Sequence, residues 1–374
     1  MSTEQPFILF VPSYGKGGSG EFVRSVSLAQ AAQARWPQAR IEFLLPGGAG
    51  TRQDAPFPKH CHAGPEDDKD AFDREQILRL RPQLAVFDSG CRTSTLRLCH
   101  RLGIRTAYIS DRHGTLRKAF RLEWLWRLDA HWHQREHLTA PPFTPRQRLL
   151  ARLGRTRRLH FDTYFPEAAA DWSQLPAVLR ERLVRGYVLF SPGGGGYRVD
   201  GRLITDVFLD AAARVRRGAG LECLTLLGPL YPGAAPDDPE LPTLREVPQA
   251  LFLELMRRAR VVVTNGGHSL HQALARGAVC VAAPLGGSDQ PERIEAYGKA
   301  GLVRAAAPAA ETLAAAACAL AGDAAACSAI RRRIAALSIR NGIPVMLDGI
   351  AGLLGEAAAP AVPAACSGTD VSSV

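Results

Sequence analysis

Four short turns in the sequence combine glycines with polar side chains, the residue types that hold phosphate and sugar groups. They are the segments 13–21, 191–196, 264–269 and 284–293. Glycine lets the backbone approach a ligand closely, and a helix that begins directly after a turn offers unpaired backbone N–H groups to an anion. Each turn follows a short apolar run, so binding or catalysis is expected at these four places.

The first turn, SYGKGGSGE, follows the apolar run 7–11. It is not a Walker A loop, because no Gly-Lys-Ser/Thr closes it. It is not the dinucleotide fingerprint either, since no acidic residue closes the second expected strand. Phosphate binding and a merely tight turn both stay open. The residues of interest are Gly17, Gly18, Ser19, Gly20 and Glu21.

The second turn, SPGGGG, carries four consecutive glycines. Such a run costs backbone entropy, so close approach to a diphosphate or nucleotide is favoured over a purely structural role. The residues expected to make this approach are Gly193, Gly194 and Gly195.

The third turn, TNGGHS, again leads from an apolar run into a helical pattern. Gly266 and Gly267 precede first-turn N–H groups that, together with Ser269, suit a diphosphate. Gln272 lies one helical turn further and shares that face. His268 is either catalytic or, as is more common near a helix start, a hydrogen-bonding or capping group.

The fourth turn ends in Asp289-Gln290, just before another helical pattern. A carboxylate and an amide together supply the acceptors and the donor that read sugar hydroxyls. Alternatively, Asp289 is a helix N-cap with Pro291 in the first helical turn.

The elements that position these turns form two series of strand-then-helix units. In the first series the expected strands are 7–11, 41–45, 84–87 and 106–109, and the expected helices are 22–34, 94–102 and 116–128. In the second series the expected strands are 187–191, 223–227, 260–263 and 280–283, and 305–337 is expected to be helical. Alternation of strands and helices predicts an α/β protein with two Rossmann-like parallel-sheet domains that face a cleft.

The expected domains cover residues 1–163 and 164–355. The connection between them is placed within or just after 141–176, which has many prolines and arginines and little periodicity. The segment 356–374, composed largely of Ala, Pro, Ser and Gly, is expected to be a disordered tail. The longest apolar runs are too short for a membrane span or a signal peptide, which predicts a cytoplasmic protein.

The net charge of +10 is concentrated in one segment. Between residues 112 and 158 there are twelve Lys and Arg but three Asp and Glu. Such a surface attracts polyanions, anionic lipid head groups or phosphate-bearing substrates, or it is simply a solvated Arg-rich face. Tryptophans in the segment are expected to pack in the core, so nucleic acid is not an expected partner. Peripheral contact with an anionic inner membrane through this segment is considered instead.

Taken together, these turns resemble those of nucleotide-sugar glycosyltransferases of the two-Rossmann (GT-B) fold. The branch is that of the lipid-II-forming N-acetylglucosaminyltransferase and the UDP-glycosyltransferase superfamily. The pattern consists of Gly266, Ser269, a residue five before Gly277, a strand ending in Pro284, and Asp289-Gln290. The resemblance is strongest over 187–303.

The resemblance assigns roles to these positions. It implies that the glycine turn holds the donor diphosphate and that Asp289-Gln290 contacts the donor sugar. Two positions depart from the family pattern. The ribose position is Gln272 rather than an acid, and the residue three beyond Gln290 is Arg293 rather than Asn.

The resemblance also implies a reaction. A hexose or N-acetylhexosamine passes from a nucleoside-diphosphate sugar, expected to be a UDP-sugar, to an acceptor hydroxyl, with inversion and without metal or other cofactor. Helix N-termini stabilise the leaving diphosphate, and a general base takes the acceptor proton. Glu21 is the first candidate base, Asp111 the second and Asp88 the third. Glu21 has an alternative role as a first-turn carboxylate that is favourable against the helix dipole.

The expected acceptor is lipid-linked or anionic, which places the reaction in bacterial envelope or glycoconjugate biosynthesis. Two kinds of alternative remain. One is a nucleotide-sugar hydrolase or 2-epimerase on the same fold. The other is a basic binding protein that is catalytically inactive.

Overall fold

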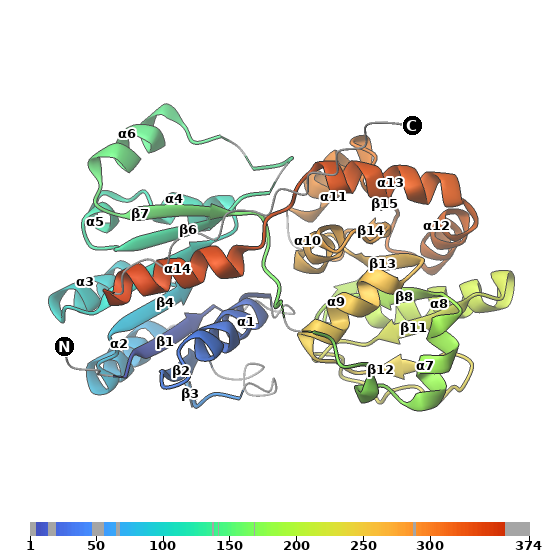
Figure 1. The fold of residues 1–374 in the computed structure, drawn as a ribbon, viewed down its shortest axis with the longest axis horizontal. Coiled ribbons are helices and arrows are strands. Elements are labelled where there is room, and N and C mark those ends of the chain that lie inside the picture. Colours follow the sequence, from blue (N-terminus) through green and yellow to red (C-terminus); the bar gives the residue numbers. More distant parts are fainter. Residues whose placement is uncertain are drawn as a thin grey trace, which may run out of the picture.

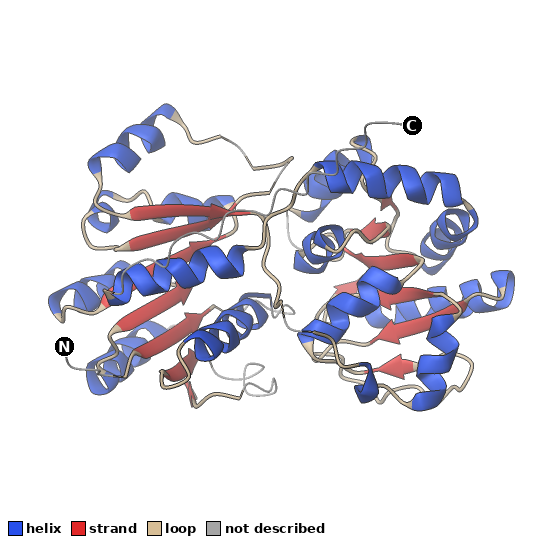
Figure 2. Ribbon diagram, in the orientation of Figure 1, coloured by secondary structure: helices blue, strands red, loops and turns tan. Residues whose placement is uncertain are grey.

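The computed structural model of this chain describes residues 5–13, 20–46, 56–64, 68–136, 138–140, 142–167, 169–286 and 289–355. Two α/β domains lie next to each other, each built around a parallel sheet (Figure 1). Helices cover the sheets (Figure 2). The predicted α/β fold with two Rossmann-like parallel-sheet domains is confirmed.

The N-terminal sheet has seven parallel strands in the order β3-β2-β1-β4-β5-β6-β7. The strands are β1 Phe7–Pro12, β2 Arg40–Leu45, β3 Lys59–Cys61, β4 Leu84–Asp88, β5 Arg105–Ser110, β6 Ala130–Gln134 and β7 Arg157–Phe161. The strands β1 and β4 are buried along their whole length. This two-sided burial explains their continuous apolar sequences.

In the described part of this domain, six helices precede the second sheet. They are α1 Gly20–Arg35, α2 Lys69–Leu80, α3 Thr93–Arg101, α4 His113–Lys118, α5 Leu122–Leu125 and α6 Pro145–Leu153. The sheet reverses its strand order at β1, which pairs with both β2 and β4. A ligand crevice opens at such a reversal, beyond the carboxyl ends of the strands. The first turn of α1, which carries Glu21, lies at this point.

The C-terminal sheet has six parallel strands in the order β12-β11-β8-β13-β14-β15. Its strands are β8 Tyr187–Ser191, β11 Glu222–Leu226, β12 Thr243–Leu244, β13 Val261–Asn265, β14 Cys280–Ala283 and β15 Arg304–Ala305. Its helices are α7 Ala177–Val184, α8 Ile204–Ala219, α9 Gln249–Arg258, α10 His268–Ala275, α11 Gln290–Lys299, α12 Ala310–Gly322 and α13 Ala324–Ala336. A short antiparallel hairpin of β9 Arg198–Val199 and β10 Arg202–Leu203 follows the second glycine turn.

The last described helix, α14 Gly342–Leu354, returns to the N-terminal domain (Figure 1). Its residues Ile343, Met346 and Ile350 belong to the same buried cluster as Trp132 and Phe161. The expected division assigned all of 164–355 to the second domain, whereas this helix packs on the first. The expected tail, 356–374, lies outside the described residues.

The chain therefore crosses between the domains twice, and the two crossings are hydrogen-bonded to each other. The backbone N–H of Gly342 donates to the carbonyl of Thr163 over 2.7 Å. The side chain of Asn341 accepts from the N–H of Phe165 and donates to its carbonyl, at 3.1 and 2.9 Å. The crossings form one joint rather than two separate linkers.

Several elements differ from the sequence-based expectation. The stretch 116–128 is two short helices with a break rather than one, and the proline- and arginine-rich stretch contains α6 and β7. The strand β6 was not anticipated either. Among the described residues, no single helix is long and apolar enough to span a membrane, although the bent pair α12 and α13 passes by length and composition together.

Candidate functional site

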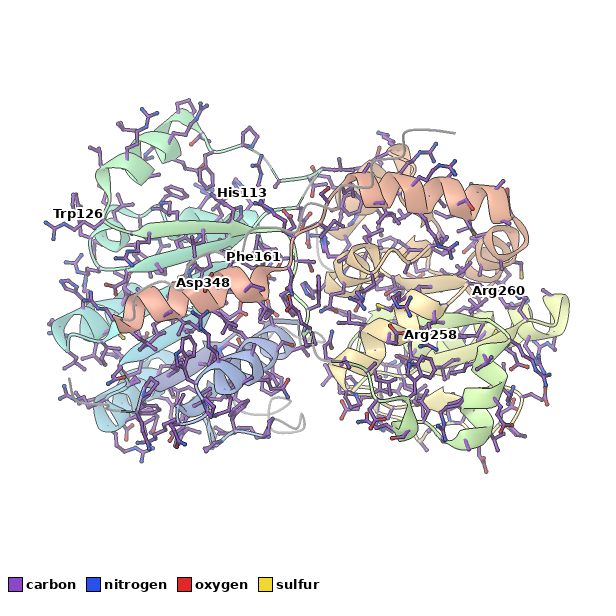
Figure 3. The ribbon with its side chains drawn as sticks, in the orientation of Figure 1. His113, Trp126, Phe161, Arg258, Arg260 and Asp348 are labelled. Carbon is purple, nitrogen blue, oxygen red and sulfur yellow. The ribbon has the colours of Figure 1, made fainter. Side chains whose placement is uncertain are left out.

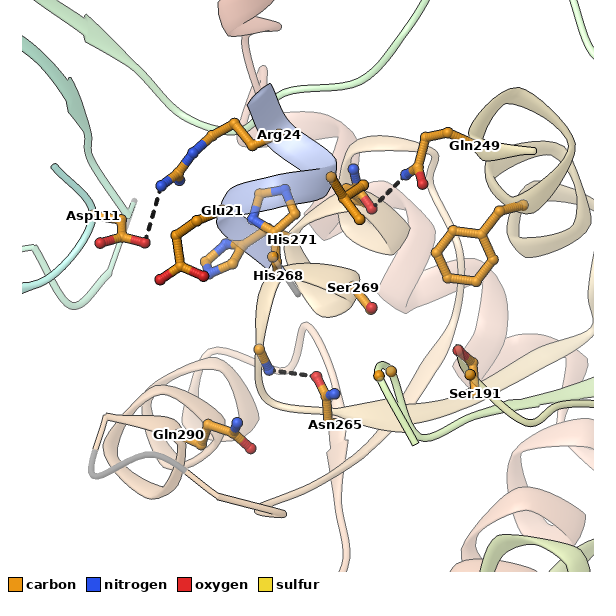
Figure 4. A pocket seen from close by; sticks show the side chains of 18 of the residues that line it. Glu21, Arg24, Asp111, Ser191, Gln249, Asn265, His268, Ser269, His271 and Gln290 are labelled. Carbon is orange, nitrogen blue, oxygen red and sulfur yellow. Dashed lines mark hydrogen bonds and ion pairs between the residues drawn. The ribbon is translucent and has the colours of Figure 1, made fainter. Parts of the chain in front are cut away.

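A cavity of about 330 Å³ lies where the carboxyl ends of the two sheets face each other (Figure 4). Its lining includes the start of α1 and the residues after β5 and β6 on one side. On the other side it includes the turns after β8 and β13 and the starts of α9, α10 and α11. The two domains therefore both contribute to the site that the glycine turns indicated.

The second and third glycine turns are fastened to each other through Asn265 at the end of β13. Its side-chain amide donates to the carbonyl of Pro192 over 2.9 Å and accepts from the N–H of Gly267 over 2.7 Å. Gly193 has a φ of +85°, and a Cβ there would lie 2.3 Å from the Asn265 nitrogen. Glycine is thus required at 193 by both backbone conformation and space, and the two turns act as one unit.

If this turn holds a nucleoside diphosphate, as the resemblance implies, Gly193→Ala should weaken the binding of UDP about tenfold, because the added Cβ displaces Asn265 and with it the turn that presents N–H groups to phosphate. Isothermal titration calorimetry with UDP measures the effect. Gly218→Ala is the matched control, since Gly218 lies in α8 with nothing within 4 Å of an added Cβ. Equal affinities for UDP in wild type and Gly193→Ala would contradict this role of the turn.

Not all of the predicted turn residues reach the cavity. Gly20, Gly193, Gly194, Gly267, His268 and Ser269 line it, whereas Gly195 and Gly266 do not. A Cβ on Gly195 would lie 2.2 Å from the carbonyl of Leu227, so close packing between turns explains this glycine. The residues Gly17, Gly18 and Ser19 lie outside the described part of the chain.

His268 is held between the domains rather than being poised for proton transfer. Its ring stacks on that of Tyr164 with centroids 3.9 Å apart and planes at 13°. Burial and the nearby positive charge of Arg24 lower the pKa of His268 well below the ordinary histidine value. The ring is therefore neutral at pH 7 and packs on Tyr164, a role different from the catalytic, hydrogen-bonding and capping roles considered from the sequence.

Gln272 makes two contacts that occupy both ends of its amide. It donates to the carbonyl of Tyr164 over 3.0 Å and accepts from the side chain of Gln249 over 2.9 Å. Gln249 lies at the start of α9 and also lines the cavity. The amides of Gln272 and Gln249 thus lie at the position where the resemblance implies ribose binding. Gln272 can donate a hydrogen bond to the Tyr164 carbonyl, whereas an ionised acid at this position could not.

Arg293 is fully engaged by protein groups. Its guanidinium forms a bidentate pair with Glu136 of the N-terminal domain, contacts the carbonyl of Gly266, and reaches Asp289 over 2.6 Å. Its side chain is 6% exposed and that of Glu136 is 12% exposed. Although burial favours the protonated acid, the hydrogen bonds from His271 and Arg293 keep the pKa of Glu136 well below its usual range. Arg293 therefore joins the domains from the wall of the cavity, which it also lines.

The remaining residues of the fourth turn are placed to meet a ligand. The Asp289 side chain is 42% exposed and lines the cavity. The Gln290 side chain accepts from the N–H of Leu285 over 3.0 Å, which fixes the amide and leaves its nitrogen towards the cavity side of the turn. In the structure Asp289 also stands at the N-cap position of α11, without a side-chain capping bond.

Across the cleft, the three candidate bases surround one buried arginine. Arg24 of α1 donates two hydrogen bonds to Asp88, one to Gln134 at 2.7 Å and one to Asp111 at 3.2 Å. Asp88 is fully buried. It is absent from the cavity lining, so it is not positioned to meet a substrate.

Glu21 and Asp111 have opposite electrostatic surroundings. Burial, together with the negative charges of Asp111 and Asp88, raises the pKa of Glu21 above that of an exposed glutamic acid. Burial also acts on Asp111, but the guanidiniums of Arg24 and Arg112 outweigh it and hold the pKa of Asp111 below its ordinary value. A pair of carboxylates whose pKa values are pushed apart is typical of an acid–base site. Glu21, which also pairs with Arg112 at 2.5 Å, is the better proton acceptor of the two.

Sequence reasoning missed several residues of this site. Arg24, Gln134, Glu136, Tyr164 and Gln249 line the cavity alongside the predicted residues. Gln134 ends β6 and Glu136 lies just after it, and this strand carries three polar residues and shows no apolar run. Arg24, three residues after Glu21 and thus on the same helical face, could have been found from that spacing. Among the described residues, no group of His, Cys, Asp or Glu is arranged to hold a metal ion.

Comparisons with known proteins agree with this geometry at the level of the fold. No family model matches the sequence, and no curated protein matches it by sequence. Solved structures do match. CalG4, the calicheamicin glycosyltransferase, is 17% identical, and the match covers 94% of this chain and 99% of that one with a TM-score of 0.60.

Two plant enzymes give similar values. A UDP-glucosyltransferase from Polygonum tinctorium is 14% identical over 96% of this chain and 100% of its own, with a TM-score of 0.63. UGT2 of Phytolacca americana, solved with UDP-2fluoro-glucose and pterostilbene, is 12% identical over 94% and 100%, with a TM-score of 0.62. The chain thus has the complete two-domain fold of GT-B glycosyltransferase structures.

Proposed function

We propose that the chain is a glycosyltransferase that moves a hexose or N-acetylhexosamine from a UDP-sugar to an acceptor hydroxyl. One observation carries this proposal. In a GT-B fold, the glycine turn at Gly267–Ser269 lines the same cavity as Glu21, a carboxylate whose pKa is raised. A diphosphate site that shares one cavity with a proton acceptor is the arrangement that sugar transfer requires.

The donor lies with its diphosphate at the start of α10. There the N–H groups of the first turn and the helix dipole favour negative charge. The sugar lies towards Asp289 and Gln290, and the nucleoside towards Gln249, Val247 and Phe252, which also line the cavity. Structures with the same fold that hold UDP or UDP-2fluoro-glucose support the choice of uridine.

In the proposed reaction, Glu21 removes the proton from the acceptor hydroxyl as that oxygen bonds to the anomeric carbon. The bond from this carbon to the diphosphate oxygen breaks, and the electron pair leaves with the nucleoside diphosphate. Direct displacement inverts the anomeric configuration. Asp111 stays ionised and keeps Arg24 and Arg112 in place, while the charge that grows on the leaving diphosphate is stabilised by the α10 turn without a metal.

A thermal-shift screen of UDP-, dTDP- and GDP-sugars tests the donor site. We expect a UDP-sugar to stabilise the chain by about 2.7 kcal/mol at a hundredfold excess over its Kd, and the other two classes to stabilise it less. Stabilisation by none of the three would contradict the proposal and leave an inactive binding protein.

Product analysis separates the enzymes that share this donor site. UDP released at the same rate with and without an acceptor indicates a nucleotide-sugar hydrolase. Interconverted sugar epimers indicate a 2-epimerase. Acceptor-dependent UDP release, with the new glycosidic bond found by mass spectrometry, supports transfer.

The setting of the reaction is also part of the proposal. We place the protein in the cytoplasm, with an acceptor that is lipid-linked or anionic, in bacterial envelope or glycoconjugate biosynthesis. The supporting feature is the basic segment 112–158, whose surface forms part of the N-terminal domain.

A further inference from the structure

The helix α6 has no buried side chain, although it carries three leucines. Leu149 and Leu153 are 57% and 56% exposed. A nine-residue helix is marginal in water by itself, and in proteins such helices are normally held by an apolar face packed on the core. The outward apolar side of α6 therefore has no partner within the described chain.

The neighbouring helix α5 extends this apolar surface. Leu122 and Trp126, at the start and just after the end of α5, are 62% and 53% exposed. The end of α6 is attached beside them, because the N–H of Arg155 donates to the carbonyl of Leu125 over 3.0 Å and its guanidinium lies 5.9 Å from the Trp126 ring. Figure 3 shows Trp126 at the outer edge of the N-terminal domain. We call Leu122, Trp126, Leu149 and Leu153 the α5–α6 surface.

Exposed apolar side chains are concentrated in this region. Of the eight large apolar side chains that are exposed among the described residues, five lie between residues 122 and 153. They are accompanied by positive charge, since 112–158 contains twelve Lys and Arg against three Asp and Glu. The exposed arginines that lie in or directly next to α5 and α6 along the chain are Arg121, Arg146, Arg148, Arg152 and Arg155.

We propose that the α5–α6 surface docks on a bilayer that contains anionic phospholipids. The leucines and the tryptophan enter the boundary between head groups and acyl chains, and the arginines pair with the phosphates. Charge complementarity decides the occupant. A protein partner or a second copy of this chain would have to present a matching acidic surface in one particular orientation. An anionic bilayer presents negative charge over its whole surface.

The position of the surface fits a catalytic protein at a membrane. The helices α5 and α6 directly precede β6 and β7, so they lie at the amino ends of these strands, whereas the cavity lies at the carboxyl ends (Figure 1). Docking leaves the cavity open to a soluble donor. Docking would enrich the enzyme near a lipid-linked acceptor, and this benefit rests on the proposed function. The contact with the membrane itself does not depend on that function.

Vesicle co-sedimentation of the full chain tests the contact. The vesicles contain either phosphatidylcholine alone or phosphatidylcholine and phosphatidylglycerol in a ratio of about 3:1. Each kind is tested at low and at high salt. We expect binding to the mixed vesicles that weakens with salt, and about a tenfold lower partition coefficient for the double variant Leu149→Glu/Leu153→Glu. Both side chains are exposed, so the variant keeps its fold, which circular dichroism checks.

The matched control is Val178→Glu/Val184→Glu on α7. These valines are 71% and 82% exposed but lie outside the basic segment, so this variant should bind vesicles almost as the wild type does. Equal losses in the two double variants would overturn the proposal, as would absence of binding to the mixed vesicles.

Other occupants give different results, each of which also overturns the proposal. A dimer that Leu149→Glu/Leu153→Glu dissociates, without vesicle binding, assigns the surface to a second copy. Retention on heparin without vesicle binding assigns it to a soluble polyanion. Binding of a UDP-sugar by the wild-type chain is measured in parallel. Absence of this binding would argue against the proposed function, whereas the vesicle result would still stand by itself.

Discussion

A Glu21→Gln variant is expected to lose sugar transfer by about 10²- to 10⁴-fold while it still binds the UDP-sugar. Glutamine keeps the size and the hydrogen bond to Arg112 but cannot accept the proton of the acceptor hydroxyl. Donor affinity is retained because Glu21 belongs to α1 of the N-terminal domain and is not part of the α10 turn, although both line the cavity. Steady-state kinetics, with titration calorimetry of the donor, separates the two effects. Wild-type turnover in this variant would remove Glu21 from the mechanism.

The pH dependence of kcat follows from the same residue. A general base works only when it is deprotonated, so the rate falls as the pH drops through the pKa of Glu21. Burial and the neighbouring carboxylates raise that pKa, and the acid limb therefore lies above the ordinary glutamic acid value of about 4.3. In Glu21→Gln the residual activity should show no such limb.

Asp111 provides a second comparison. If Asp111 rather than Glu21 were the base, the acid limb would lie below the ordinary aspartic acid value, because the pKa of Asp111 is lowered. The limb would then persist in Glu21→Gln and vanish in Asp111→Asn. The position of the limb and its response to each substitution thus identify the base.

Removal of Glu136 is expected to have the largest effect on stability. In Glu136→Ala the guanidinium of Arg293 stays buried between the domains without its main partner, which costs about 3 kcal/mol for a pair of this kind. Asp289 still contacts Arg293, which places the cost at the lower end of the usual range. Urea unfolding followed by circular dichroism measures the change.

Glu295→Ala is the control for Glu136→Ala. Glu295 also forms an ion pair on α11, with Lys299 at 2.5 Å, but both side chains are exposed. Loss of this exposed ion pair should leave the free energy of unfolding almost unchanged. Equal effects of the two substitutions would show that the Glu136–Arg293 pair does not hold the domains together.

The pH dependence of the Glu136 contribution is also fixed in sign. The pKa of Glu136 is lower in the folded chain than in the unfolded one. Its stabilising effect is therefore complete above about pH 4.3 and declines only as the pH falls further towards the folded pKa. The difference between wild type and Glu136→Ala should stay constant around neutral pH and shrink on acidification.

Apolar runs were the reliable guide to this fold. Strands such as β1, β8 and β13 are buried on both faces and therefore consist largely of consecutive apolar residues. Their positions could be predicted from the sequence. The positions of β6 and β7, towards one side of the N-terminal sheet, could not. The strand β6 reads Ala-His-Trp-His-Gln, and its two histidines are buried beside Ser110 by hydrogen bonds that only the neighbouring strand explains.

The site divides in the same way. Glycines and the carboxylate of Glu21 could be found from local patterns, because backbone conformation and helix starts are local properties. The roles of Gln272 and Arg293 depend on Tyr164 and Glu136, which are more than one hundred residues away in the sequence. A contact between two domains produces no recognisable pattern in the local sequence of either contacting segment.

The joint between Thr163–Phe165 and Asn341–Gly342 means that the N-terminal domain is not a continuous piece of the chain. A fragment that stops before α14 would uncover Trp132 and Phe161, which pack against that helix. Single proteolytic cuts near either crossing would leave the halves associated. A chimera that exchanges whole domains with another GT-B protein would therefore have to keep residues 342–354 with the N-terminal domain. Such a chimera needs two junctions in the chain rather than one.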